Sequence, residues 1–493
     1  MNRYWMPPFL AGMMVFCVSC SRPAAEQPAA AAAAGTGAAA DKTPAAGTVA
    51  PAAKPAPAAP AAVPTVTLIT LDPGHFHAAL VQKTMYPQIN PTVYVYAPQG
   101  DELAGHLKLI ESYNSRPDNP THWKEEIYTG ADFAAKAFSE KKGNVLVLAG
   151  DNQKKIEYIK GGIEAGLHVF SDKPMCINAE GYALLKEAFQ TAGQKKLLLY
   201  DIMTERYEIT TILQKELAHK PEVFGQLKTG SADDPAIVKE SVHHFYKVVS
   251  GSPLKRPAWF FDTARQGEGI VDVTTHLVDL ILWEAFPEQP IAADQTRVEA
   301  ARRWPTILTA EQFRQVTQTS GFPPYLSGAL TADGALACYA NGQIDFTVRG
   351  IWARVKVEWN YQAPEGAGDT HFSVMKGTRA NLVIRQGKEQ NYRPELYVEP
   401  AEGVSADDLA AAMFKATLDL QRTWPGVRAL RDGGRWHIAV PDRYRIGHEA
   451  HFAQVTEKFL KFLEAGRMPE WELSNMLTKY YITTTALGMA KTQ

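Results

Sequence analysis

The chain has 493 residues, 45% of them hydrophobic and 10% aromatic, which is enough for two ordinary domains with buried cores. Its 51 basic and 53 acidic side chains nearly cancel and form no block of like charge. This balance argues against a nucleic-acid-binding surface or a polybasic membrane patch and favours a small-molecule partner.

The first 20 residues have the pattern of an export signal. Arg3 supplies a positive charge, and the apolar run at 9–18 is too short to span a bilayer comfortably. The run ends in Cys17-Val-Ser-Cys20, which resembles a bacterial lipoprotein signal with Cys20 as the lipidated residue, although Cys17 stands where that pattern usually has Leu. We therefore expect a protein on the periplasmic side of a bacterial membrane, lipid-anchored at Cys20. The alternative is a plain cleaved signal and a soluble periplasmic protein.

Residues 21–64 are almost wholly Ala and Pro, with no apolar periodicity that could build a core. Prolines at 44, 51, 55, 57, 60 and 64 weaken the competing reading as an Ala-rich helix. The segment is predicted to be a disordered, semi-stiff tether between the anchor and the folded body.

Residues 65–205 alternate strand-like and helix-like patterns. A helical pattern such as 153–165 separates short apolar runs that we predict to be strands at 66–71, 92–96, 144–149, 168–170 and 196–200. This alternation predicts a Rossmann-type, doubly wound parallel sheet of the α/β class, with ligands at the carboxyl ends of its strands.

The rhythm changes over residues 206–493, where we predict an α+β domain with an open, mostly antiparallel sheet. Helices are expected at 208–219 and 269–285 and, closing the chain, at 449–465 and 474–490; strands are expected near 225–230 and at 335–339, 343–348, 355–361 and 380–385. Outside the signal the chain has two cysteines, Cys176 and Cys338, so one disulfide is possible. Since no His/Cys cluster has metal-ligand spacing, no metal site is expected.

The turn after the first predicted strand reads Thr70-Leu-Asp-Pro-Gly74-His-Phe-His77. A dinucleotide fold usually places three glycines here, so that the backbone approaches the pyrophosphate; this chain has only one. The end of the second strand also lacks the acidic residue that reads an adenosine ribose, and Asp101 comes a little late, so NAD and NADP both stay open. We expect His75 and His77, at i and i+2 of a helix, to face apart and to pack rather than bind metal.

Asp272 and His276 follow a pair of glycines and lie four residues apart. On a helix these positions share one face, which predicts a proton-transfer pair in which a carboxylate supports a basic imidazole. Alone, the spacing is more often that of an ordinary polar helix face.

Longer motifs raise the odds of a catalytic site. They are Val145 to Asn152, then Glu164-Ala-Gly-Leu-His168-Val-Phe, Asp172-Lys173-Pro174, and the segment from Gly267 to Asp279. Together they resemble the family of glucose-fructose oxidoreductase, inositol dehydrogenase and MocA (Gfo/Idh/MocA), in a branch of secreted bacterial lipoproteins with a divergent C-terminal domain. The resemblance covers roughly residues 65–490.

The resemblance implies an NAD(P)-dependent oxidoreductase with three catalytic residues. Lys173 would lie between nicotinamide and substrate hydroxyl, Asp272 would bind and polarise the substrate, and His276 would be the general base. The residues expected around the cofactor, NAD or NADP, are Leu71, Asp72, Gly74, His75, Phe76, Gly150, Asn152, Asp172 and Lys173. Those expected around the substrate are His243, Arg256, Trp259, Asp272 and His276.

Our leading hypothesis is an exported oxidoreductase that moves hydride between a sugar or glycoside hydroxyl, with C3 as one candidate carbon, and a tightly bound cofactor. The cofactor should be held tightly, because no free pool is expected outside the cytoplasm. One alternative is a redox-neutral enzyme that cleaves or epimerises a glycoside, and another is a non-catalytic sugar-binding lipoprotein. The sugar, its carbon, and the homo-oligomeric state are left open.

Overall fold

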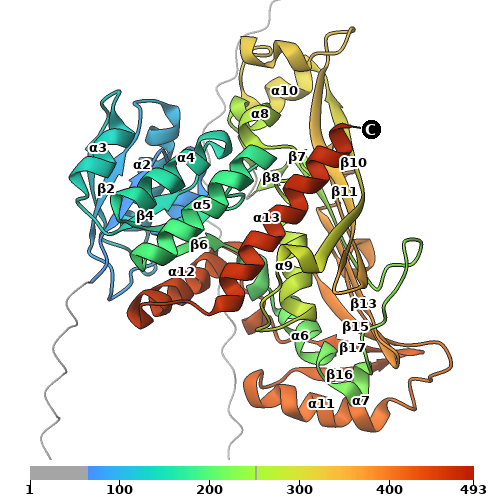
Figure 1. Cartoon of the computed structure of the whole chain (residues 1–493). Helices are drawn as coiled ribbons and strands as arrows, with labels where there is room; N and C mark the ends of the chain where they lie inside the picture. The colour runs from blue at the N-terminus through green and yellow to red at the C-terminus, as the bar shows by residue number, and fades with distance from the viewer. Residues whose placement is uncertain (1–64, 250–251, 493) are drawn as a thin grey trace, which may run out of the picture. The chain divides into compact units, whose positions relative to one another are not determined.

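The structure, a computed structural model, describes residues 65–249 and 252–492, so the predictions for the signal and the tether lie outside the described residues. Within these ranges, no helix is both long and apolar enough to cross a membrane. The described chain is built around two large sheets (Figure 1).

The first sheet has six parallel strands in the order β3-β2-β1-β4-β5-β6. The strands are Leu68–Leu71 (β1), Thr92–Tyr96 (β2), Lys124–Tyr128 (β3), Val145–Leu148 (β4), His168–Asp172 (β5) and Leu199–Ile202 (β6). The strand order reverses between β1 and β4, and doubly wound sheets bind their ligands in the crevice outside that point. The predicted doubly wound sheet is confirmed, and each of the five predicted strands overlaps an observed one.

Strand β3 was not predicted. Its sequence, Lys-Glu-Glu-Ile-Tyr, is mostly exposed at the edge of the sheet and contains no apolar run. Charged residues are common on edge strands, where they discourage pairing with another chain, so such a strand carries little sequence signal.

The helices of the first sheet are set by local caps. Helix α4 begins where the Asp151 carboxylate accepts the backbone N–H groups of Gln153 and Lys154, and it ends at Gly166, whose φ is 88°. The helices are His77–Leu80 (α1), Asp101–Ser115 (α2), Phe133–Glu140 (α3), Asn152–Ala165 (α4) and Ala179–Lys195 (α5).

The second sheet has nine strands in the order β10-β11-β12-β7-β13-β14-β15-β17-β16. All neighbours are antiparallel except β12 and β7, which confirms the predicted open, mostly antiparallel sheet. The strands are Ile237–Tyr246 (β7), Thr296–Leu308 (β10), Leu336–Val348 (β11), Ile351–Gln362 (β12), Thr370–Lys376 (β13), Ala380–Gln386 (β14), Glu395–Pro400 (β15), Arg428–Asp432 (β16) and Arg435–Ala439 (β17). Val248–Val249 (β8) and Ser252–Pro253 (β9) form a separate pair.

Two predictions about these strands were wrong. The strand expected near 225–230 makes only isolated bridges, because Gly225 and Gly230 have φ of 76° and 69° and break an extended run. The two strands expected at 335–339 and 343–348 are one strand, β11. Gly342 within it allows Ile270 to pack closely, since a Cβ at that position would lie 2.6 Å from the Ile270 Cβ.

The second sheet is packed by helices, among them α6, α9 and α13. Helices of this half are Thr204–Tyr207 (η1), Ile209–Ala218 (α6), Pro221–Phe224 (α7), Ala258–Phe261 (η2), Thr263–Gln266 (α8), Thr274–Ala285 (α9), Ala293–Gln295 (η3), Ala310–Thr317 (α10), Pro324–Ala329 (η4), Lys388–Gln390 (η5), Ala410–Thr423 (α11), Asp442–Tyr444 (η6), His448–Ala465 (α12) and Glu470–Lys491 (α13). Helix α9 begins at Thr274, five residues later than predicted.

The closing helices join the two sheets. Phe452 and Phe459 of α12 lie in the core of the parallel sheet, whereas α13 contributes Tyr480 to that core and Leu487 to the core of the second sheet. In Figure 1 α13, drawn in red, accordingly runs from α5 to β10. This arrangement fixes the carboxyl edge of the first sheet against α9.

A buried ionic cluster strengthens the same junction. Arg206 of η1 donates to both Asp279 oxygens at 2.6 and 2.7 Å, and Lys479 of α13 lies 2.8 Å from Asp279 and 2.6 Å from Asp201. Because Asp279 is on α9, the cluster locks the helix that carries His276. Cys176 and Cys338 are both buried and free, so the disulfide left open by the sequence does not form.

Candidate active site

The carboxyl end of β5 meets the turn before α9. Lys173 Nζ lies 2.5 Å from Asp272 Oδ1, and Gln266 Nε2 donates to the other Asp272 oxygen at 3.0 Å. Burial lowers the pKa of the Lys173 ammonium, but the carboxylates of Asp272 and Asp172 outweigh it and leave the pKa raised. Lys173 is therefore held as a cation.

His276 lies on α9 with its Nδ1 buried and without a hydrogen-bond partner. Burial, followed by the charge of Lys173, lowers the pKa of His276 to about 3, so the imidazole is neutral and can accept a proton. Asp272 precedes the helix, and its two oxygens bind Lys173 and Gln266 rather than the imidazole. The carboxylate and the imidazole of the predicted pair are therefore not joined by a direct hydrogen bond.

The turn after β1 lies against the start of α4. A Cβ at Gly150 would lie 2.4 Å from the Asp72 carbonyl oxygen, so only glycine permits this approach. The Asp72 carboxylate, whose pKa is raised by burial, accepts the Tyr158 hydroxyl at 2.9 Å. Above the turn, a Cβ at Gly74 would lie 3.5 Å from Trp259 Cζ2, and Trp259 Nε1 is buried without a partner.

His75 and His77 do not face apart as the sequence predicted. His75 precedes α1, which starts only at His77, so the i,i+2 argument for a helix does not apply. Their rings are 4.1 Å apart, and their Nδ1 atoms lie 3.9 and 2.9 Å from one oxygen of Asp172. Burial lowers the pKa of both imidazoles, which keeps them neutral.

The donor atoms of His75, His77 and Asp172 all lie within 4.8 Å of one another, close enough to hold a metal ion. Two observations favour hydrogen bonding instead. His77 Nδ1 is at hydrogen-bonding distance from Asp172, and Lys155 Nζ lies 3.1 Å from the Asp172 carbonyl oxygen, so a second cation would be repelled. The prediction that the chain has no metal site stays a prediction.

Lys155 supports the Asp172-Lys173-Pro174 turn through hydrogen bonds. Its ammonium donates to Asn152 Oδ1 at 2.5 Å and to the carbonyl oxygens of Asp172 and Pro174 at 3.1 and 3.3 Å. Burial lowers the Lys155 pKa to about 8. Asn152 Nδ2 in turn donates to the Gln266 carbonyl at 2.7 Å, which ties α4 to the residue that holds Asp272.

Two of the predicted substrate residues, His243 of β7 and Arg256 in the segment before η2, form a separate group. Arg256 donates to the carbonyl oxygens of Phe245 and His244, and its guanidinium lies 5.1 Å from the Trp359 ring. His243 stacks on the same ring at 4.9 Å. Burial lowers the Arg256 pKa to about 10, and Asp369 and Asp272 are the carboxylates that oppose the shift.

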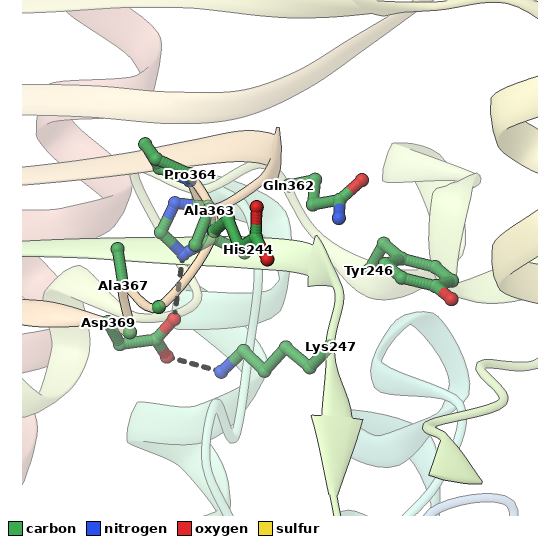
Figure 2. A pocket seen from close by; sticks show the side chains of 11 residues that line it. His244, Tyr246, Lys247, Gln362, Ala363, Pro364, Ala367 and Asp369 are labelled. Atoms are coloured by element: carbon green, nitrogen blue, oxygen red, sulfur yellow. Dashed lines mark hydrogen bonds and ion pairs between the residues drawn. The ribbon is translucent and has the colours of Figure 1, made fainter. Parts of the chain in front are cut away.

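A cavity of about 470 Å³ borders this group, at the ends of β7 and β12. Figure 2 shows Asp369 inside it, with one oxygen bound to His244 Nδ1 at 2.9 Å and the other paired with Lys247. The second oxygen also lies 3.3 Å from His243 Nδ1. These contacts engage both carboxylate oxygens of Asp369 and hold the loop before β13 in place.

A second cavity has a volume of about 420 Å³. It is lined by Glu205, Glu208, Gln386, Arg393, Arg445, His448 and His451 among others. Burial raises the pKa of the Glu205 carboxyl, but the imidazoles of His448, His276 and His451 outweigh it and leave the pKa lowered. The lining offers many hydrogen-bond donors and acceptors, as a polyhydroxylated ligand requires.

The structure thus gathers most of the predicted residues at one edge of the parallel sheet, whereas His243 and Arg256 lie in the separate group beside Trp359. Trp259 covers Gly74 on the cofactor side, and the aromatic surface beside His243 is Trp359. Leu71 is buried in β1 and can offer only its backbone, while the Phe76 side chain is 48% exposed. The sequence analysis missed Gln266, Lys155 and His448, because no short motif connects these residues to the other members of the site.

Comparisons with known proteins found both a family and similar structures. A family model described as "Putative oxidoreductase C terminal domain" matches residues 213–491. No curated protein matches. The crystal structure of a "putative oxidoreductase" from Parabacteroides merdae ATCC 43184 is similar with 54% identity and a TM-score of 0.85, over 87% of this chain and 98% of that one.

Two more distant structures share the fold alone. A levoglucosan dehydrogenase in complex with NADH and levoglucosan is 12% identical with a TM-score of 0.56, over 87% of this chain and 97% of that one. A 3-ketoreductase from Actinomadura kijaniata in complex with NADP is 10% identical with a TM-score of 0.51, over 85% and 95% of the two chains.

Proposed function

The chain belongs to the oxidoreductase family defined by that C-terminal domain, and we propose that it oxidises or reduces a sugar or glycoside hydroxyl with a tightly bound NAD(P). It has the two-sheet fold of Gfo/Idh/MocA oxidoreductases. The observation that carries the proposal is the Lys173–Asp272 pair at the carboxyl edge of the parallel sheet. The charge of Lys173 also helps to keep His276 neutral.

The crevice beside β1 and β4 fits a dinucleotide. Gly150 allows the turn after β1 to approach the start of α4, where a Cβ would lie 2.4 Å from the Asp72 carbonyl oxygen, and beside Gly74 the indole N–H of Trp259 is a buried donor with no partner. Gly74, His75, Gly150, Asn152 and Asp172 would hold the cofactor, which supplies a hydride acceptor and donor at the substrate carbon. Trp259 over Gly74, with Arg265 stacked on it at 5.3 Å and paired with Asp151, supports tight binding.

The chain's own residues account for the proton and the charge. The Lys173 ammonium stabilises the oxyanion that develops when a hydroxyl is oxidised, and Asp272 keeps it protonated. Gln266 holds the Asp272 carboxylate in position. The neutral His276 takes the hydroxyl proton.

The first test is analysis of the purified protein by absorbance and mass spectrometry for a copurifying nicotinamide. The proposal predicts about one NAD or NADP per chain; a protein that carries none, and binds none when it is supplied, would contradict it. The second test is a screen of glycosides for keto products, with C3 as the expected carbon. His276→Ala and Lys173→Met should abolish turnover while sugar binding stays measurable.

The two alternatives separate in the same screen. Release of an aglycone without net reduction of the cofactor would identify redox-neutral cleavage, and a changed sugar without a net redox change would identify epimerisation. If the wild type and both variants bind sugar equally and none of them forms a product, the chain is a non-catalytic sugar-binding protein.

We also propose that the protein is exported and lipid-anchored at Cys20, on the strength of the signal-like sequence. Expression of the chain with Cys20→Ala should move it from the membrane fraction to the soluble periplasmic fraction. Equal membrane association of both forms would rule out the anchor.

A further inference from the structure

Five side chains form a closed ring of hydrogen bonds that includes the Lys173–Asp272 pair. Lys155 Nζ donates to Asn152 Oδ1 at 2.5 Å, and Asn152 Nδ2 donates to the Gln266 carbonyl oxygen at 2.7 Å. Gln266 Nε2 donates to Asp272 Oδ2 at 3.0 Å, and the other Asp272 oxygen lies 2.5 Å from Lys173 Nζ. We call this set, Lys155–Asn152–Gln266–Asp272–Lys173, the buried ring.

The backbone of the turn after β5 closes the buried ring. Lys155 Nζ also donates to the carbonyl oxygens of Asp172 and Pro174, at 3.1 and 3.3 Å. These residues lie on either side of Lys173, so their carbonyl groups fix its backbone. Both partners of the Lys173–Asp272 contact therefore lead back to Lys155, one through the backbone and the other through the side chains of the ring.

The buried ring joins parts of the chain that lie far apart in sequence. Asn152 and Lys155 are three residues apart at the start of α4, whereas the other members follow β5, end α8 and precede α9. Lys155, Asn152, Gln266 and Asp272 are all buried, and the Lys173 side chain is 12% exposed. Hydrogen bonds in such a site are stronger than those in water, so the ring holds its geometry.

The side chain of Asn152 connects two members of the ring. An ammonium can only donate, so the amide oxygen of Asn152 must face Lys155 and its NH₂ group must face the Gln266 carbonyl. Both ends of the amide are thus engaged within the protein. The resemblance assigns Asn152 to the cofactor, and its backbone is the part that stays available for that contact.

The three acceptors around Lys155 require its ammonium form. An ammonium has three N–H donors, and Lys155 has one acceptor for each of them, on Asn152, Asp172 and Pro174. A neutral amine has only two N–H donors. Loss of the Lys155 proton therefore breaks a hydrogen bond either in the ring or in the turn that carries Lys173.

We propose that Lys155 is a positioning residue, whose ammonium holds Lys173 and Asp272 in their reacting arrangement and loosens them when it loses its proton. The proposal rests on the proposed function and assigns Lys155 no part in bond breaking. Lys155 acts through Lys173, which remains the group that stabilises the oxyanion. Asn152 and Gln266 are the connecting residues.

The groups of the site titrate in separate pH ranges. Burial lowers the pKa of Lys155 to about 8. The pKa of Lys173 is raised above its ordinary value and that of His276 is lowered to about 3, so neither of them changes charge between about pH 7 and 10. The charged or titratable groups that face Lys155 are Asp151 at the start of α4, Asp172 and Lys173 after β5, Asp272 before α9, and His75 of the β1 turn.

The first experiment measures kcat against pH with the glycoside that the screen identifies. In the wild type, kcat should fall above about pH 8. In Lys155→Met, kcat at pH 7 should fall by roughly 10- to 100-fold with KM and nicotinamide content little changed, because a small displacement of the reacting groups costs rate. Lys155→Arg keeps its charge at all these pH values, so it should restore part of the rate and remove the alkaline fall.

The matched control is Lys154→Met, at an exposed position of the same helix, which should keep the wild-type kcat and pH profile. A wild-type kcat in Lys155→Met would overturn the proposal, and so would an alkaline fall that stays at the same pH in Lys155→Arg. Loss of nicotinamide in place of kcat would also overturn it, because Lys155 would then support the cofactor and not the Lys173–Asp272 pair.

Asn152→Ala opens the buried ring at a second point. It should lower kcat in the same way, and the double variant with Lys155→Met should be no slower than the slower single variant, because both changes break one ring. Losses that multiply in the double variant would show that the two residues act independently, and the ring would be wrong.

The last experiment needs no substrate and separates the two hypotheses. In spectra of the chain labelled with ¹³Cε-lysine, the Lys173 signal, identified by its loss in Lys173→Met, should shift in Asn152→Ala and stay in place in Gln153→Ala, at the exposed neighbouring position. An unchanged Lys173 signal in Asn152→Ala would overturn the ring. A chain that turns over no glycoside but shows this shift would contradict the proposed function alone.

Discussion

Lys173 Nζ lies 2.5 Å from Asp272 Oδ1, and this contact joins the last residues of a parallel strand to the turn before α9. The two residues are 99 positions apart: Lys173 follows β5, and Asp272 precedes α9. Their side chains are only 12% and 8% exposed, so each charge depends on the other. The same contact that prepares the site for catalysis also holds the two halves of the fold together.

A double-mutant cycle should separate these two roles. Lys173→Met leaves the buried Asp272 carboxylate unpaired, and we expect a loss of about 3 kcal/mol in the free energy of unfolding. Adding Asp272→Asn should recover much of that loss, because the buried charge is gone. Urea denaturation gives the stabilities.

Activity should behave differently in that cycle. Both Lys173→Met and the double variant should lose turnover by roughly 10³-fold or more, since no ammonium remains to stabilise the oxyanion. Recovery of turnover together with stability would mean that Lys173 has only a structural role.

Lys155 predicts an unusual dependence of stability on pH. Its pKa is lowered to about 8 from 10.5, so between these values the unfolded chain binds a proton that the folded chain has released. The free energy of unfolding should therefore rise with pH across this window, by about 3 kcal/mol for the Lys155 contribution.

The matched comparison is with Lys154, the residue that precedes Lys155. Lys155→Met should remove that rise, whereas Lys154→Met, at an exposed position of the same helix, should keep it. Denaturation of the three proteins at pH 7.5 to 10.5 is the measurement. Equal slopes in all three would show that Lys155 is not the group that titrates.

Much of this architecture could be predicted from the sequence, because buried parallel strands such as Val145–Leu148 are continuous apolar runs. The edge strand Lys124–Tyr128 could not, since an exposed strand needs no such run. For the site, the four-residue spacing identified Asp272 and His276 as candidates, and the resemblance around Asp172-Lys173-Pro174 added Lys173. Arguments from spacing alone were unreliable. They failed for His75 and His77, whose convergence on Asp172 depends on where α1 begins. His448 is 371 residues from its partner His77, and only tertiary packing brings them together.

The buried cluster around Asp279 should be essential for stability. Lys479→Met removes the cation that lies within 2.8 Å of both Asp201 and Asp279, and we expect a loss of about 3 to 5 kcal/mol. The exposed pair of Arg314 with Glu311 is the contrast, and Arg314→Met should cost less than about 1 kcal/mol. Comparable losses in the two variants would mean that the cluster does not anchor α9.

Gly150→Ala tests the turn that we assign to the cofactor. The added Cβ would lie 2.4 Å from the Asp72 carbonyl oxygen and 2.9 Å from the Gly74 nitrogen, both of them backbone atoms that cannot rotate away. The β1 turn must therefore shift, at a cost of about 1 to 3 kcal/mol in the free energy of unfolding. Because the same turn forms the proposed dinucleotide crevice, the variant should also lose most of its copurifying nicotinamide.

Gly105→Ala is the control. Gly105 is exposed on α2, and no atom lies within 4 Å of the added Cβ. The substitution should therefore stabilise the helix by about 0.5 to 1 kcal/mol and leave the cofactor content unchanged. A Gly150→Ala protein of reduced stability that keeps its full complement of nicotinamide would place the cofactor elsewhere.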